Sequence, residues 1–342
     1  MALCQTQFIG FHEAIKLKDE NKVLREKREI IEKRIKENLP EEAKSYEVFN
    51  QGSYAMNTGI QPLDGDYDID MGLFFDMSTE DATPIEAKQW VYDAVKDHTD
   101  DVTFKTPCIT VKYTAGYHVD ITVYSVSNSD GKLYLAKGRK NSKEENKKWD
   151  ESNPRDLVST INGHFTDADD RKQFRRVVRY LKRWKDVHFS SVNGKPTGIA
   201  LTSCVYHWLS VQKDTDPFTG KSTYRDLDAV INVIESMISR FNTVFELEEG
   251  EVKSYSRLSV DLPVEPYPEL FVKMTNKQME TFKEKLEEFK TALRDAKSKA
   301  DPVDAAEILQ KQFGTDFPVP PRPTTGKRSM AVATIPSSES AL

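Results

Sequence analysis

The chain has 342 residues, a charged fraction of 30%, a hydrophobic fraction of 38% and a formal net charge of -6. This composition is ordinary for a globular protein. It excludes a general basic surface for polyanions, so any phosphate site must be a local basic patch. No apolar run approaches the roughly 20 residues of a membrane-spanning helix, and three dispersed cysteines argue against a disulfide framework. We therefore expect a cytoplasmic protein without membrane contact.

The N-terminal segment, residues 1–42, reads as a helix. Its apolar side chains recur at mostly helical spacings among many Lys and Glu residues: Ile15, Leu24, Ile31, Ile35 and Leu39. Pro40 cannot continue a helix. The pattern predicts one long amphipathic helix over residues 12–39, and we expect it to brace the two lobes described next.

Residues 43–165 change character and are expected to form a catalytic core. The predicted elements are strands at 46–49, 67–75, 102–106, 108–113 and 118–124, and a helix from 84 to about 98. Thr83, Pro84 and Glu86 form a capping-box sequence for that helix. The core should therefore contain a mostly antiparallel sheet with one helix, followed by a polar, turn-rich stretch.

From Asp167 onward nearly everything has helical periodicity, so residues 166–320 are expected to form a helical lobe. The predicted helices cover about 169–187, a segment beginning near Pro196, and then 226–244, 275–298 and 302–313. Residues 321–342 have the composition of a flexible tail. Strands followed by helices indicate an α+β fold with two lobes and a substrate site in the cleft between them.

Asp68 and Asp70 are the first candidates for chemistry. They lie two apart on one predicted strand and therefore point to the same face, while Ile69, Met71 and Leu73 point to the other. Two aspartates at this spacing, with no other evidence, usually lie on the solvated edge of a strand. Here the opposite face is strongly apolar, and a third aspartate, Asp120, lies in a second strand with apolar neighbours. Adjacent carboxylates repel unless a hard divalent cation such as Mg²⁺ or Mn²⁺ binds them.

Gly52 and Ser53 lie between the first two predicted strands, with Ser53 15 residues before Asp68 (68 minus 53). A glycine lets the backbone approach a phosphate, amide groups at a helix start favour anions, and Ser53 adds a hydroxyl donor. Such a pair is common in turns, but between two strands and facing three carboxylates it predicts a triphosphate cradle. We expect Gln51, Gly52 and Ser53 to bind the triphosphate.

Three carboxylates facing a phosphate cradle indicate two-metal phosphoryl chemistry, in which two ions clamp the attacking and leaving oxygens. Asp68 and Asp70 would bridge both ions, and Asp120 would complete one site and accept the proton of the attacking hydroxyl. Lys182 borders the apolar stripe of the basic helix and could reach a triphosphate. The other Arg and Lys residues of that helix are interpreted as a solvated face.

At this point the sequence resembles a known family. QGSYAMNT, YDIDMGLFF and YHVDITVY look like the core of the cGAS/DncV-like nucleotidyltransferases of bacterial antiphage systems. NKKWDESNPRDLV, RVVRYLKRWKDVHF with NGKPTGIALTS, and EILQKQFGTDFP resemble later segments of the same family. The likeness runs from about residue 45 to about residue 320, and it implies the polymerase-β-like bilobed fold.

The resemblance also implies roles. Gly52 and Ser53 would hold the donor triphosphate. The metal ligands would be Asp68, Asp70 and Asp120, which bind two ions. Lys182 would contact a triphosphate. Thr197 falls where the family often has a serine, and Gly198 departs from a second one. The implied activity joins NTPs, ATP and GTP foremost, into a cyclic di- or trinucleotide that activates an effector. A conjugating enzyme acting on the C-terminus is a further implied partner.

Two alternatives share these residues. A nucleotidyltransferase that modifies a protein, an RNA end or a small molecule would use the same three aspartates. A binding module that keeps the fold without the chemistry is disfavoured, because all three carboxylates are present. Activation by nucleic acid would need a long basic surface in a chain of net negative charge, so we expect activity without nucleic acid.

Overall fold

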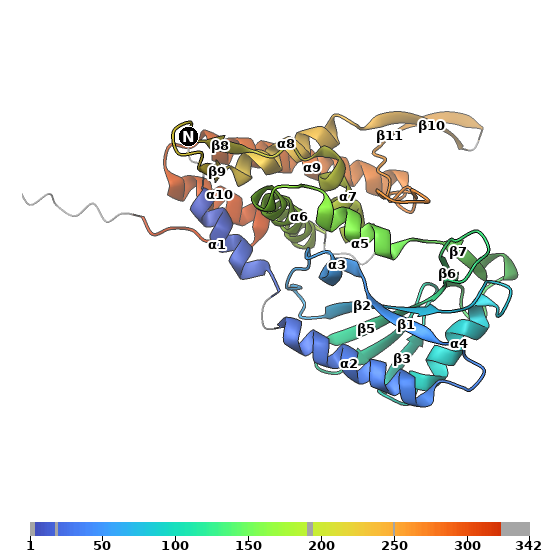
Figure 1. The fold of residues 1–342 in the computed structure, drawn as a ribbon. Coiled ribbons are helices and arrows are strands. Elements are labelled where there is room, and N and C mark those ends of the chain that lie inside the picture. Colours follow the sequence, from blue (N-terminus) through green and yellow to red (C-terminus); the bar gives the residue numbers. More distant parts are fainter. Residues whose placement is uncertain (1–3, 18–19, 190–193, 249, 323–342) are drawn as a thin grey trace, which may run out of the picture.

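The computed structural model describes residues 4–17, 20–189, 194–248 and 250–322. Figure 1 shows two lobes, a sheet with covering helices and a bundle of helices above it. This arrangement confirms the predicted α+β, two-lobed fold. None of the helices in those residues is both long and apolar enough to cross a membrane. The predicted flexible tail, residues 321–342, lies almost entirely outside the described part of the chain.

The sheet lobe is built on a mixed sheet of seven strands. The strands are β1 (Tyr46–Asn50), β2 (Tyr67–Phe75), β3 (Asp101–Phe104), β4 (Ile109–Tyr113), β5 (Tyr117–Ser125), β6 (Tyr134–Lys137) and β7 (Lys148–Glu151). The order is β1-β2-β5-β4-β3, with β6 and β7 continuing from the end of β5. β2 and β5 run parallel and the other pairs antiparallel. The parallel pair at the centre brings two distant segments side by side.

The two faces of this sheet have different partners. Ile69, Met71 and Leu73 of β2, together with alternate residues of β5, enter a core under α2 (Glu20–Asn38) and α4 (Pro84–Val95). Because side chains alternate along a strand, Asp68 and Asp70 point to the opposite face, towards the helical lobe. The alternation seen in the sequence therefore decides which residues face the cleft. The Thr83–Glu86 capping box also forms as predicted.

The single long helix predicted for residues 12–39 is wrong. The chain forms α1 (Gln5–Ile15) and α2, and the backbone at Lys16 is extended and bridges to Ile60. Each helix serves a different core: Phe8, Phe11 and Ile15 pack in the helical lobe, whereas the apolar stripe of α2 packs on the sheet. One straight helix could not bury both stripes in two separate cores, so the chain breaks between them.

The helical lobe surrounds α6 (Ala168–His188), which contacts α1, α7, α8 and α10. Its other helices are α5 (Pro154–Gly163), α7 (Gly198–Trp208), α8 (Asp226–Ile238), α9 (Asn276–Ser298) and α10 (Pro302–Phe313). Inside it Arg176 forms a buried bidentate pair with Asp226, which also accepts from Tyr180. This pairing compensates the burial of both charges.

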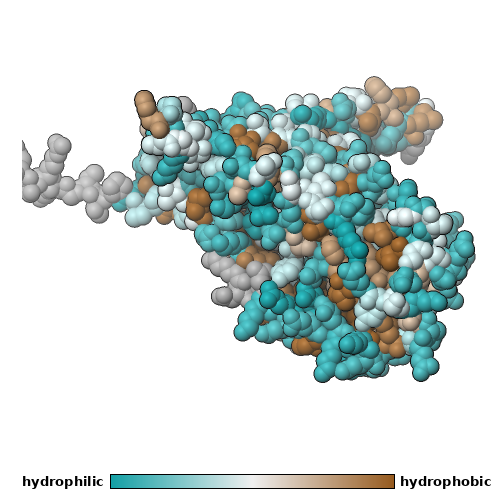
Figure 2. All heavy atoms as spheres, in the orientation of Figure 1, coloured by the Kyte–Doolittle hydropathy of each residue, from teal (hydrophilic) through white to brown (hydrophobic). Residues whose placement is uncertain are grey.

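Two hairpins interrupt the helical lobe, and neither is predicted by the sequence pattern. They are β8 (Lys213–Thr215) with β9 (Ser222–Tyr224), and β10 (Asn242–Glu248) with β11 (Glu251–Arg257). The helix expected over residues 226–244 ends at Ile238 because the following Thr-Val-Phe segment favours a strand. Figure 2 shows apolar surface on the β10–β11 hairpin at the upper right, where Phe245, Leu247 and Val252 are exposed.

Candidate active site

A cleft of about 510 Å³ lies between the two lobes. The sheet lobe lines it with Gln51, Gly52, Ser53, Asp68 and Asp70, and the helical lobe with Lys182, Lys185, Asp186, Thr197 and Gly198. Seven of the eight site residues predicted from the sequence thus line one cavity. The eighth, Asp120, lies on the strand beside Asp70. Segments far apart in the chain converge here, as a site between two lobes requires.

The parallel pairing of β2 and β5 sets the geometry of the carboxylates. Asp70 lies directly opposite Asp120, and Asp68 lies opposite His118. Burial, together with the charges of Asp68 and Asp120, raises the pKa of Asp70 to about 7. Within the described residues no group donates a hydrogen bond to the Asp70 carboxylate. A half-buried carboxylate without a donor, beside two others, carries a negative charge that a bound cation would compensate.

Asp120 is more firmly held than the other two aspartates. The Thr110 hydroxyl donates a hydrogen bond to Asp120 Oδ1, and Lys105 Nζ lies 3.6 Å from the same oxygen. Thr110 is fully buried on the antiparallel neighbour β4. The carboxylate therefore has a fixed orientation, with Oδ1 held by the Thr110 hydroxyl and paired with the Lys105 ammonium.

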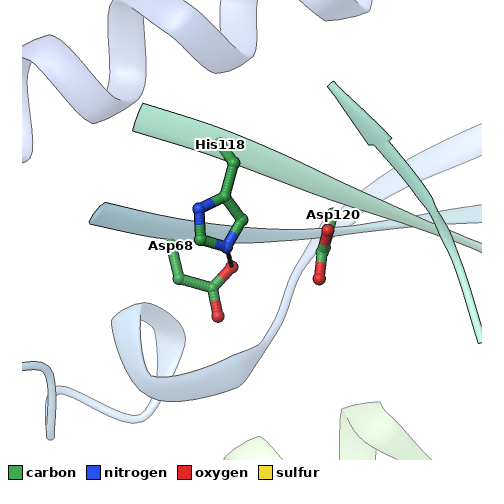
Figure 3. Close-up of side chains that lie close together, drawn as sticks. All are labelled: Asp68, His118 and Asp120. Carbon is green, nitrogen blue, oxygen red and sulfur yellow. Dashed lines mark ion pairs between the residues drawn. The ribbon is translucent and has the colours of Figure 1, made fainter. Parts of the chain in front are cut away.

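His118 belongs to the same cluster and was missed by the sequence analysis. Its Nε2 lies 3.2 Å from Asp68 Oδ1, and its Nδ1 lies 3.0 Å from Asp66 Oδ1. Figure 3 shows the imidazole turned towards Asp68, with Asp120 on the same strand. The hydrogen bond to Asp68 and the contact with Asp66 raise the pKa of His118 to about 9 despite burial. Its position two residues before Asp120, on the same strand face, is the signal that could have identified it.

These groups fit a divalent cation. One ligand atom each from Asp68, His118 and Asp120 lies within 4.8 Å of the other two, and Asp70 completes the wall of carboxylates. Carboxylate oxygens are the ligands that Mg²⁺ and Mn²⁺ take in proteins. The donor set and the unsatisfied Asp70 together support a site for divalent metal.

The Gly-Ser turn packs directly on this cluster. Gly52 has φ +66°, and a Cβ at that position would overlap the Asp70 carboxylate. The backbone N–H of Gln51 also donates to the Asp70 carbonyl at 3.3 Å. Gly52 opens the short helix α3 (Gly52–Ala55), in agreement with the sequence expectation of a helix start there. Only glycine allows both this backbone conformation and this close approach.

The side chain of Gln51 is occupied within the protein. Its Nε2 donates to Thr122 Oγ1 at 2.7 Å, and its Oε1 accepts from the Tyr124 hydroxyl at 3.1 Å. Thr122 and Tyr124 follow Asp120 on β5, on the face turned to the cleft. The side-chain amide thus anchors the Gly-Ser turn to β5. A contact of Gln51 with a triphosphate would have to come from its backbone.

Lys182 is buried rather than lying at the edge of a wet face. Its Nζ donates to the Thr58 carbonyl at 3.0 Å and lies 3.2 Å from the Thr58 hydroxyl. Burial, with the neighbouring charges of Lys185 and Arg179, lowers the pKa of Lys182 to about 7. Arg179 and Arg183 similarly donate to the backbone between residues 57 and 61. The expectation that these arginines form a solvated face is therefore wrong.

Thr197 has a helix-capping role in the structure. Its Oγ1 accepts from the backbone N–H of Ala200 at 3.2 Å and caps α7. Gly198 follows at the helix start, and a Cβ there would meet Lys182 Cε at 3.4 Å, an ordinary contact. The start of α7 thus lies beside Lys182 across the cleft from the Gly-Ser turn.

Comparison with known proteins defines the class. Residues 46–124 match the family described as cyclic GMP-AMP synthase DncV-like, nucleotidyltransferase domain. Residues 46–124 therefore match a nucleotidyltransferase domain, the class of protein that the sequence analysis predicted. A cyclic GMP-AMP synthase of Escherichia albertii is 26% identical over 222 residues, which cover 61% of this chain and 48% of that protein. The chain spans about half the length of this curated relative.

Solved structures share the fold of the whole chain. CdnG of Bradyrhizobium diazoefficiens, in complex with GTP, has a TM-score of 0.65 at 16% identity, covering 91% of this chain and 94% of that one. A Vibrio cholerae DncV mutant with ATP and GTP has a TM-score of 0.64 at 16% identity, covering 89% and 93%. These structures share their fold with this chain, and the domain match places a DncV-like nucleotidyltransferase domain at residues 46–124.

Proposed function

We propose that this chain condenses NTPs into a cyclic di- or trinucleotide and releases pyrophosphate, as a signal in antiphage defence. The observation that carries the proposal is the position of Gly52 directly against Asp70, which places a phosphate-binding turn beside the carboxylate cluster. The DncV-like domain match and the relative named as a cyclic GMP-AMP synthase support the cyclic product. ATP and GTP are the proposed substrates, since the similar structures hold them.

The carboxylates of Asp68, Asp70 and Asp120 would hold two Mg²⁺ or Mn²⁺ ions. Such ions neutralise the charge of a transferring phosphoryl group and lower the pKa of the attacking hydroxyl. The chain's own residues orient the reactants. Gly52 brings its backbone close to the triphosphate, Ser53 offers a hydroxyl donor, and Asp120, fixed by Thr110, would accept the proton of the attacking hydroxyl.

The helical lobe would supply the cation on the opposite wall. Lys182 lines the cleft, but its ammonium group donates to the Thr58 carbonyl. To bind a triphosphate, the ammonium group would have to break this hydrogen bond or donate to both acceptors. An arriving triphosphate would favour the protonated form of Lys182, because burial alone lowers its pKa. The same pocket would serve both rounds of bond formation, with the linear intermediate turning over before the ring closes.

Two partner proteins are part of the proposal: an effector that binds the product and an enzyme that acts on the C-terminus of the chain. A cyclic nucleotide acts by binding an effector protein, and the proposed defence role requires one. Conjugation of the C-terminus by a second enzyme is also part of this proposal, although the residues concerned lie outside the described part of the chain. Activity is expected without nucleic acid.

Product analysis tests the proposal. The purified chain is incubated with Mg²⁺ or Mn²⁺ and labelled NTPs, treated with phosphatase and resolved, with the Asp68→Asn/Asp70→Asn double variant as control. A phosphatase-resistant product that the control lacks supports a cyclising synthase, and omitting one NTP at a time identifies the bases.

Two other outcomes contradict the proposal. Pyrophosphate release without a resistant product means that the nucleotide goes to another acceptor, such as a protein, an RNA end or a small molecule. If neither wild type nor control forms product with any NTP, although the wild type binds nucleotide, the chain binds substrate without turning it over.

A further inference from the structure

The side chain of His118 is held between two carboxylates in an unequal arrangement. Its Nδ1 contacts Asp66, which precedes the strand and does not line the cleft, while its Nε2 faces Asp68 in the cluster. The side chain of His118 is 16% exposed, so it is largely fixed between β2 and β5. One ring nitrogen is thus directed to an outer carboxylate and the other to the candidate metal cluster.

This arrangement matches the surroundings of a histidine that binds a metal ion. A metal-bound imidazole nearly always donates its second N–H to a carboxylate or carbonyl, which fixes the ring and its tautomer. With Nδ1 directed to Asp66, the loss of the Nε2 proton would expose a lone pair on the side of Asp68 and Asp120. Asp66 would therefore orient the imidazole ring of His118, a role that a fully solvated carboxylate does not have.

The spacing of the candidate ligands is also suitable. Neighbouring ligands of an octahedral ion with bonds of about 2.1 Å lie about 3.0 Å apart. Asp68 Oδ1 and His118 Nε2 lie 3.2 Å apart, close to that value. The ligand atoms of Asp68, His118 and Asp120 all lie within 4.8 Å of one another, so the three side chains are close enough to be candidate ligands of one ion.

We propose that His118 Nε2 is a direct ligand of one divalent ion, so that this site has mixed nitrogen and oxygen donors and favours a transition-metal ion over Mg²⁺. The inference rests on the proposed function only in that both need a metal at this cluster. Binding of the ion displaces the proton from Nε2 to solvent. Imidazole suits transition metals, whereas Mg²⁺ keeps to oxygen ligands and water.

Mn²⁺ is the probe, because its unpaired electrons report the nuclei bonded to it. The full chain is titrated with Mn²⁺ alone, free ion is counted by electron paramagnetic resonance, and the bound ion is examined by spin-echo modulation for directly bonded imidazole nitrogen. The wild type is expected to show nitrogen modulation. His118→Gln should lose it and bind Mn²⁺ at least about tenfold more weakly.

Two further variants separate ligation from indirect effects. Asp66→Asn should keep the nitrogen modulation but bind Mn²⁺ more weakly, because the ring loses its orienting carboxylate. His98→Gln is the matched control: His98 lies in the same lobe, where its Nε2 is 2.9 Å from the Tyr113 hydroxyl, and it should behave as wild type. In competition, Mg²⁺ should displace Mn²⁺ from His118→Gln more readily than from wild type.

Several results would overturn the proposal. They are bound Mn²⁺ without nitrogen modulation in wild type, modulation that persists in His118→Gln, and no binding of Mn²⁺ by the wild type. The first of these would leave His118 as a residue that only orients Asp68. If His118→Gln fails to fold, the wild-type and Asp66→Asn spectra still decide the question. None of these readouts depends on the product, so failure of the cyclic-nucleotide assay and failure of histidine ligation are seen separately.

Discussion

The two walls of the cleft carry opposite charges and differ in how those charges are compensated. On the sheet side, Asp70 has no hydrogen-bond donor among the described residues, and its pKa is raised by burial and by Asp68 and Asp120. On the helical side, Lys182 already donates to the backbone that follows the Gly-Ser turn, as does Arg179, which does not itself line the cleft. The sheet wall is therefore prepared for a ligand, whereas the helical wall also holds the two lobes together.

On the sheet wall, the carboxylates needed for catalysis destabilise the fold, whereas on the helical wall the same cations serve binding and stability. Removing a carboxylate from the sheet wall should abolish chemistry while relieving repulsion. Removing a cation from the helical wall should weaken both substrate binding and the contact between lobes. The following predictions test this contrast, beginning with the largest expected effect.

Asp70→Asn is expected to lower the rate of product formation on the order of 1000-fold or more, because a group needed for chemistry is lost. The same change should raise the melting temperature measured without divalent ions. The folded pKa of about 7 lies above the usual value of about 3.9, so the folded state keeps a proton that the unfolded state loses. Stability of the wild type therefore falls as pH rises through that window.

The amide cannot ionise, so the gain in melting temperature of Asp70→Asn over wild type should grow from about pH 4 to about pH 8. Thermal unfolding with a chelator, across this range, measures it. Asp100→Asn, an exposed site in the same lobe, is the matched control and should change neither activity nor the pH profile. A stability gain that is independent of pH would contradict the assigned cause.

Gly52→Ala is expected to lower activity roughly 100-fold, since the new methyl group would overlap the Asp70 carboxylate and push the turn away from it. Gly65→Ala is a matched control. Gly65 also has a positive φ, +73°, but nothing lies within 4 Å of its added Cβ. Both variants should lose about 1 kcal/mol of stability from the backbone conformation alone. Steady-state kinetics and denaturant unfolding separate the two effects, and equal activity losses would refute the steric argument.

Lys182→Met is expected to raise the KM for NTP about tenfold with a smaller change in kcat, because a binding cation is lost from the helical wall. Arg179→Met is the comparison variant: it breaks a similar contact, to the Asn57 and Gly59 carbonyls, at a residue that does not line the cleft. Arg179→Met should therefore affect stability more than KM. If both variants raise KM equally, the contact between the lobes, rather than the charge of Lys182, controls binding.

Local periodicity predicted the parts of the site that depend on one segment. The alternation of β2 places Asp68 and Asp70 on the cleft face, and the Gly-Ser pair marks the helix start of α3 before that strand. The sequence pattern could have put His118 on the same strand face as Asp120, but its contact with Asp68 depends on the parallel register between two strands separated by about 50 residues. The hydrophobic pattern fixes which face of each strand is buried, but it does not say which residue of a distant strand lies opposite.

The burial of Lys182 and its neighbouring arginines was missed for a related reason. A helix with a basic face is normally solvated, and the sequence of α6 alone fits that interpretation. In the structure the backbone at residues 57–61 covers this face and supplies carbonyl acceptors. Likewise, the break between α1 and α2 reflects two separate cores, which an apolar stripe read along one helix cannot distinguish.

Thr197→Ala is expected to have the smallest effect, a loss of about 1 kcal/mol of stability with a change in KM of less than about threefold. The loss follows because the Thr197 hydroxyl accepts the N–H of Ala200 and so caps α7. Thr197→Ser keeps the oxygen and should restore stability. The KM for NTP of Thr197→Ala is the deciding measurement. A rise in KM of about tenfold or more that is absent in Thr197→Ser would show that the hydroxyl contacts the triphosphate as well. The helical wall would then contribute a second substrate contact beside Lys182, and its role would no longer be mainly to join the lobes.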